Sequence, residues 1–146
     1  MTSSSNNPIL IATSRLLTPF IQLFALYVIF HGHYGPGGGF QGGAMLAASV
    51  LLLRLAVGVE ISQRSFKRKW STPLGSLGVL VFFITGLVTL VFGGTFLEYH
   101  RLPLPALSKA ELHSHGILLI EIGVGIAVMS TLISIFDDIL GESDCE

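Results

Sequence analysis

Charged residues are scarce in this sequence. Only 12% of its 146 residues are Asp, Glu, Lys or Arg, whereas 51% are hydrophobic. Soluble domains carry roughly twice this share of charge. A chain of this length cannot hide so many apolar side chains in one soluble core, because a small domain has a large surface for its volume. The surplus must face lipid or other subunits, so we expect an integral membrane protein.

Cysteine and net charge are also low. The single cysteine, Cys145, lies one residue from the end, so it forms no internal disulfide and no cysteine metal cluster. The formal net charge of −1 gives no case for nucleic-acid binding. His31 and His33 have no third ligand close in sequence, which makes a metal site a poor interpretation. We therefore predict no metal and no cofactor.

Long apolar runs are present, and each approaches the roughly 20 residues that cross about 30 Å of hydrocarbon. We predict an all-α membrane protein with four transmembrane helices in a single domain, residues 1–146. Asn7 followed by Pro8 is a typical start for the first helix. This run ends without the small residues of a signal-peptide cleavage site, so we expect the helix to be retained. The predicted spans cover about residues 8–30, 42–59, 73–93 and 117–136.

Basic residues predict the orientation of the spans. Four spans place both termini and the middle loop on one side of the membrane. That side carries Arg15, Arg54, Arg64, Lys67, Arg68 and Lys69, whereas the other side carries Arg101 and Lys109. Basic residues favour the cytoplasmic side, so we expect cytoplasmic termini in a multi-pass protein of the inner (plasma) membrane. The basic stretch 64–69 is interpreted as a topology anchor, with a lipid-headgroup or partner patch as the alternative.

Small residues recur in two spans. Gly43 and Ala47 lie four residues apart in the second span, and Gly75, Gly78 and Gly86 interrupt the third. Small side chains let membrane helices approach closely, because lipid supplies no hydrophobic drive for their association. Packing within the chain and packing against partner proteins both fit this pattern.

The loop between the first two spans, residues 31–43, is rich in glycine. Gly37, Gly39 and Gly42 fit the spacing of a dinucleotide-binding motif, but a membrane helix precedes them where that motif needs a strand. Glycine permits positive φ angles and close backbone approach, and Pro36 prevents the first helix from continuing. Two interpretations stay open: a structural element at a subunit interface, and irregular backbone that takes part in an ion path.

Glu121 is the only acidic residue inside a predicted span. A bare carboxylate in lipid is costly, so this side chain must face protein or water. One hypothesis is a proton relay, and the other is a buried acid that only specifies packing. Ser108 with Glu111 forms a capping box that predicts a helix continuing into the fourth span. On that helix His113 and Glu121 lie about 80° apart around the axis and about 12 Å apart along it, a gap that water can bridge.

Two motifs resemble the signatures of a known family. The loop contains His33-x-x-Pro36-Gly-Gly-Gly-Phe40-x-Gly-Gly43, and later His113 precedes Glu121-Ile-Gly-Val124 by eight residues. Both resemble the MnhB/MrpB family, whose members are small membrane components of the Mrp-type multisubunit sodium/proton antiporters. The resemblance covers roughly residues 15–136, and it departs from the family's pattern at His115, Gly116 and Ile120. The loop residues concerned are His33, Pro36, Gly37, Gly38, Gly39, Phe40, Gly42 and Gly43.

The resemblance implies a four-helix subunit of a hetero-oligomeric complex, without a cofactor and without enzymatic activity of its own. Its partners would be large antiporter-like subunits and small hydrophobic subunits. Similar subunits occur in membrane-bound hydrogenases and related redox-driven complexes, so that host and a purely structural role are alternatives. Glu121 and His113 are our candidates for an ion or proton pathway, and the glycine loop is our candidate for a subunit interface.

Overall fold

The computed structural model describes residues 7–32, 35–58, 66, 68–99 and 109–142. These residues form four long helices, each long and apolar enough to cross a membrane. The helices are α1 (Pro8–His31), α2 (Gly39–Val57), α4 (Ser71–Val91) and α5 (Lys109–Glu142), with a short 3₁₀ helix η1 (Arg68–Trp70) before α4. The predicted all-α membrane architecture is confirmed.

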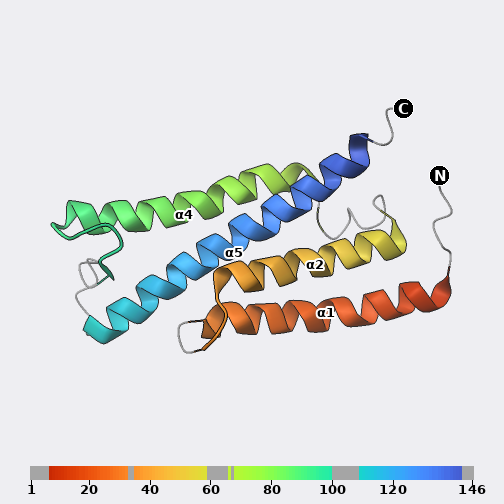
Figure 1. Cartoon of the computed structure of the whole chain (residues 1–146), viewed down its shortest axis with the longest axis horizontal. Helices are drawn as coiled ribbons and strands as arrows, with labels where there is room; N and C mark the ends of the chain where they lie inside the picture. The colour runs from red at the N-terminus through yellow and green to blue at the C-terminus, as the bar shows by residue number, and fades with distance from the viewer. Residues whose placement is uncertain (1–6, 33–34, 59–65, 67, 100–108, 143–146) are drawn as a thin grey trace.

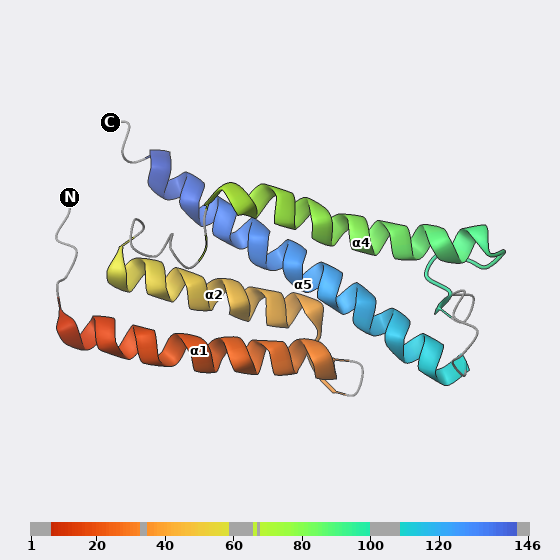
Figure 2. The same ribbon diagram turned by 180° about the vertical axis from the view of Figure 1, so that it is seen from behind.

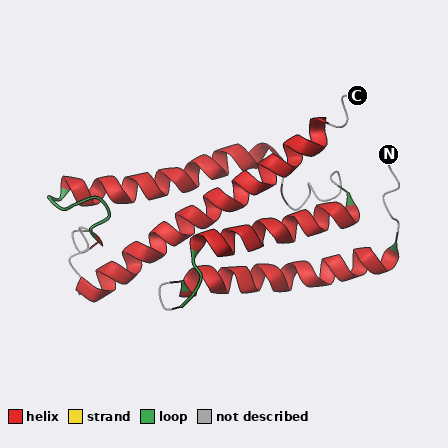
Figure 3. Ribbon diagram, in the orientation of Figure 1, coloured by secondary structure: helices red, strands yellow, loops and turns green. Residues whose placement is uncertain are grey.

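The helices lie side by side in the order α1, α2, α5, α4 (Figures 1 and 2). The long helix α5 packs against α2 on one side and against α4 on the other, while α1 packs mainly on α2. Figure 3 shows helix along nearly the whole length of the row, with the described loops at the ends of the individual helices. Wide apolar faces stay open: the side chains of Ile9, Leu23 and Val91 are each more than 70% exposed. Lipid or neighbouring subunits must cover these faces.

The helix boundaries follow local signals in the sequence. Asn7 caps α1, because its Oδ1 accepts a hydrogen bond from the Ile9 N–H at 3.1 Å, and Pro8 occupies the first helical position. This start agrees with the prediction. Helix α2 begins at Gly39, three residues before the predicted span, because part of the glycine loop coils into its first turn. Helix α5 extends beyond the predicted fourth span at both ends, so Asp137, which follows that span in the sequence, lies within the helix.

Close backbone contacts hold α5 against its neighbours. A Cβ added to Gly43 of α2 would lie 2.5 Å from the carbonyl oxygen of Gly125, and one added to Gly78 of α4 would lie 2.5 Å from that of Gly123. Real Cβ atoms do not approach so closely, so only glycine fits these crossings. The small residues at these two positions therefore serve packing within the chain.

Candidate functional site

The segment between α1 and α2 has a backbone that favours glycine. Gly37 and Gly38 have φ angles of +149° and +133°, a region that residues with a side chain rarely adopt. Gly38 precedes the first turn of α2 and is buried together with Gly39. The chain therefore reverses direction here in little space, which lets this end of α2 approach α5.

Glu121 of α5 lies against this segment. A Cβ added to Gly38 would lie 3.1 Å from Oε1 of Glu121, and one added to Gly32, at the end of α1, would collide with the same oxygen. The other carboxyl oxygen, Oε2, is buried. We call Gly32, Gly38 and Gly39 the glycine cradle, because their missing side chains leave the space that Glu121 occupies: the carboxyl group beside Gly32 and Gly38, and the backbone beside Gly39.

The cradle also contacts the backbone of α5. A Cβ on Gly39 would collide with the carbonyl oxygen of Glu121 itself. One helical turn further along α2, a Cβ on Gly42 would lie 2.8 Å from the carbonyl oxygen of Ala25 and would collide with the Ile29 side chain. Helices α1, α2 and α5 thus meet at the level of Glu121, and this crossing holds the carboxyl group in place.

The remaining loop residues lie in different surroundings. Pro36 is exposed, and the Phe40 side chain is 68% exposed. A Cβ on Gly37 would meet Val28 Cγ1 at 2.9 Å and would lie away from Glu121. His33 lies outside the described residues. The sequence singled out the loop and Glu121 separately, whereas the structure brings Gly38 and Gly39 of the loop into contact with that residue.

His113 lies near the start of α5 and is exposed. Its ring packs edge-on against Tyr99, with ring centroids 5.4 Å apart. Tyr99 also lies over Gly116, and partial burial raises the pKa of the Tyr99 hydroxyl above its usual value. His113 and Glu121 therefore occupy different environments two turns apart, and a water path between them stays a prediction.

A buried ion pair links α2 to the far end of α5, and the sequence analysis missed it. Arg54 Nη1 donates a hydrogen bond to Asp137 Oδ1, and the two side chains are 0% and 2% exposed. Arg54 Nη2 also donates to the carbonyl oxygen of Phe66 at 3.0 Å. The sequence counted Arg54 only among the basic residues that set the topology. The available signal was a basic and an acidic residue at the ends of two spans that the predicted topology places on the same side.

Metal coordination requires several His, Cys, Asp or Glu side chains to lie together. Within the part of the chain that the structure describes, no three His, Cys, Asp or Glu side chains come together as a possible metal site. His31, at the end of α1, stacks on Tyr27 at 4.2 Å, and His115 forms a hydrogen bond with the Glu111 carbonyl oxygen at 2.7 Å. These two rings are thus engaged in local contacts within their own helices.

Known proteins resemble this chain over most of its length. Residues 9–134 match the family described as "Domain related to MnhB subunit of Na+/H+ antiporter". A Na(+)/H(+) antiporter subunit of Bacillus subtilis (strain 168) is 31% identical, over 88% of this chain and 94% of that protein. The "Putative antiporter subunit mnhB2" of Staphylococcus aureus (strain Newman) is 33% identical, over 92% of this chain and 96% of that protein.

One solved structure is similar in both fold and sequence. It is a chain of the membrane-bound sulfane sulfur reductase, an archaeal respiratory membrane complex, with a TM-score of 0.74 and 35% identity. The match covers 96% of this chain but only 60% of that one, so the protein spans less than two thirds of this structural relative. With the family match over residues 9–134, these findings show that the chain belongs to the MnhB family.

Proposed function

We propose that this protein is a small integral membrane subunit of a multisubunit cation/proton antiporter, where it supports ion translocation and assembly. Its relatives of nearly equal length carry the names of antiporter subunits, and its four apolar helices form an open row that needs partners. Its partners are then large antiporter-like subunits and small hydrophobic subunits in the plasma membrane. Its part in the complex is transport, and it carries out no enzymatic reaction of its own.

The enclosure of Glu121 by the glycine cradle is the observation that carries this proposal. The carboxyl group lies on a membrane-spanning helix, one of its oxygens is buried, and Gly32 and Gly38 face it. A carboxyl group can accept and release a proton, and an acidic side chain inside a membrane span must face protein or water rather than lipid. Such a group can accept a proton from one side and release it to the next member of a path, with His113 as a candidate nearer the start of the same helix.

Replacement of Glu121 tests this role. In membrane vesicles containing the assembled complex, Glu121→Gln keeps the shape of the side chain but removes the titratable proton. We expect cation/proton exchange to fall by at least about tenfold, because a positioned proton-transfer group contributes about 10² or more to a rate. Glu111→Gln is the matched control, since Glu111 is an exposed acid near the start of the same helix. Unchanged exchange in an assembled Glu121→Gln complex would refute the relay.

A purely structural role is the second candidate, and the exposed Phe40 beside the cradle favours it. An exposed aromatic side chain next to a rigid turn is a typical anchor for a partner protein. If this role is the whole function, Phe40→Ala or Gly38→Ala dissociates the complex, whereas Glu121→Gln leaves transport intact. Assembly measured by co-purification, together with exchange per assembled complex, separates the two roles.

A redox-driven complex is the alternative host. The observation that favours this alternative is that the solved structural relative is part of a respiratory membrane complex. Genes for hydrogenase-like or other redox subunits next to the gene for this protein would support it, and genes for antiporter subunits alone would support the antiporter. The proposed role of Glu121 is the same in both hosts.

A further inference from the structure

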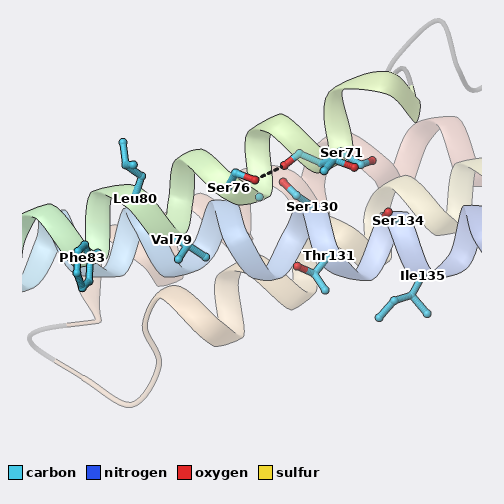
Figure 4. A pocket seen from close by; sticks show the side chains of 11 residues that line it. Ser71, Ser76, Val79, Leu80, Phe83, Ser130, Thr131, Ser134 and Ile135 are labelled. Carbon is cyan, nitrogen blue, oxygen red and sulfur yellow. Dashed lines mark hydrogen bonds between the residues drawn. The ribbon is translucent and has the colours of Figure 1, made fainter.

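A groove of about 560 Å³ lies between α4 and α5, close to the start of α4 (Figure 4). Its two ends differ in chemistry. One end carries hydroxyl groups from both helices together with Ile135, and the other is apolar, with Val79, Leu80 and Phe83. The hydroxyl groups belong to Ser71, Thr72, Ser76, Ser130, Thr131 and Ser134.

Gly75 keeps the groove open at its hydroxyl end. A Cβ added there would make ordinary contacts, 3.5 Å from Ser130 Cβ and 4.0 Å from Thr131 Oγ1. This glycine differs from Gly78, where an added Cβ would collide with the backbone of α5. Close helix packing therefore does not require a glycine at position 75, and the space beside it is available to an occupant.

The buried hydroxyl group of Ser71 indicates that the occupant of the groove has polar groups. Its side chain is 2% exposed, yet its Oγ has no hydrogen-bond partner among the described residues. A buried hydroxyl without a partner is costly, and native structures seldom leave one. The Ser76 and Ser130 hydroxyls each donate to a carbonyl oxygen of their own helix, which leaves their oxygens able to accept. Among these three hydroxyl groups, Ser71 is the one whose hydrogen is available to an anionic oxygen.

The groove has the polarity of one membrane leaflet. Ser71 and Phe83 are twelve residues apart on α4, which is about 18 Å along the helix, and half of the hydrocarbon layer is about 15 Å thick. Trp70, at the start of α4, is 54% exposed, and Lys69 beside it is exposed. Exposed tryptophan and lysine side chains are typical of the membrane boundary. The hydroxyl end therefore lies at headgroup level, and the apolar end lies among the acyl chains.

We propose that this groove binds an anionic phospholipid. Its phosphate would lie at the hydroxyl end near Lys69, with Ser71 as a hydrogen-bonding partner, and one acyl chain would lie along Val79, Leu80 and Phe83. The exposed Lys69 supplies the positive charge that complements an anionic headgroup.

Filling the groove tests the proposal. The full-length chain, purified in detergent with equal amounts of phosphatidylglycerol and phosphatidylcholine, is analysed by native mass spectrometry. We expect one retained phosphatidylglycerol, bound about fivefold more tightly than phosphatidylcholine, and its loss in Gly75→Leu. Leu77→Phe is the control, because Leu77 is exposed on the same helix but does not line the groove. Absence of retained lipid in the wild type, or equal retention in Gly75→Leu, overturns the proposal.

A second variant keeps the test valid if Gly75→Leu fails to fold. Lys69→Gln leaves the groove intact, and we expect it to reduce the preference for phosphatidylglycerol about fivefold, the ratio that one basic side chain contributes near an anionic surface. Arg15→Gln removes the same charge from an exposed position on α1 and should leave the preference unchanged. An unchanged preference in Lys69→Gln overturns the assignment of the headgroup to this end.

The assembled complex provides the last arm of the test. A photoactivatable amino acid in place of Leu80, which is 52% exposed in the groove, reports its nearest neighbour. A cross-link to lipid supports the proposal. A cross-link to another subunit instead shows that a partner helix covers the groove, and it overturns the lipid assignment.

Discussion

Gly39 allows two backbones to touch where α2 crosses α5. Because a Cβ at this position would collide with the Glu121 carbonyl oxygen, no small shift of a flexible side chain can relieve the contact. Overpacking of this kind costs about 1–3 kcal/mol. We expect Gly39→Ala to lower the free energy of unfolding of the purified protein by that amount, measured by denaturation in detergent. Gly35→Ala is the control, since a Cβ at Gly35 meets nothing within 4 Å. Equal stability of the two variants would show that the crossing is looser than described.

Arg54 and Asp137 form a buried ion pair, so the charge of each side chain is compensated by the other. Removing one partner leaves an uncompensated buried charge, which costs about 3–5 kcal/mol, whereas replacing both with apolar residues is often neutral. We therefore expect Arg54→Met to reduce the yield of folded protein strongly, and Arg54→Met with Asp137→Leu to recover much of it. Unfolding in detergent, followed by circular dichroism, measures both. A double variant as unstable as the single one would contradict this account of the pair.

At the scale of the elements, the two glycines of α4 have different roles. Gly78 brings α4 against α5, where an added Cβ would lie 2.5 Å from the Gly123 carbonyl oxygen and 2.7 Å from the Ala127 backbone nitrogen. We expect Gly78→Val to push the two helices apart, and spin labels at Leu77 and Leu132, both exposed, to report a longer distance between α4 and α5. Gly75→Ala should leave that distance unchanged, because its Cβ has room. Equal distances in both variants would contradict the close crossing.

The elements were the part of the structure best predicted from the sequence. Asn7 and Pro8 located the start of α1, and the capping signal at Ser108 anticipated that α5 begins well before the apolar run. Contacts between distant segments could not be predicted in the same way. No local pattern states that Gly38 will face Glu121, or that Arg54 will meet Asp137, because these pairs depend on how the helices cross.

At the scale of the whole molecule, the topology remains a prediction with a simple test. The start of α1 and the end of α5 lie at the same end of the row (Figure 1). Positive charge predicts that this end is cytoplasmic. Cys145, the single cysteine, follows α5 in the sequence, so a membrane-impermeant thiol reagent should label it in inside-out vesicles and not in right-side-out vesicles. Labelling only in right-side-out vesicles would reverse the orientation.

The open row of helices explains why the function of this protein belongs to an assembly. A single layer buries few of its own apolar side chains, and the turn between α1 and α2 lies against the Glu121 side chain. Composition alone predicted that lipid or partner proteins surround the chain. Membership of the MnhB family indicates that the partners are other membrane subunits of a complex. The order of the helices in the row, which places α5 in contact with both α2 and α4, had no signal in the sequence.

We propose that the carboxyl group in the glycine cradle accepts and releases protons during exchange. Exchange per assembled complex, measured in vesicles for the wild type, Glu121→Gln and Glu121→Asp, tests it most directly. The account predicts that Glu121→Gln loses exchange while the complex stays assembled, and that Glu121→Asp retains part of it because a titratable group remains. Wild-type exchange in the fully assembled Glu121→Gln complex would contradict the account.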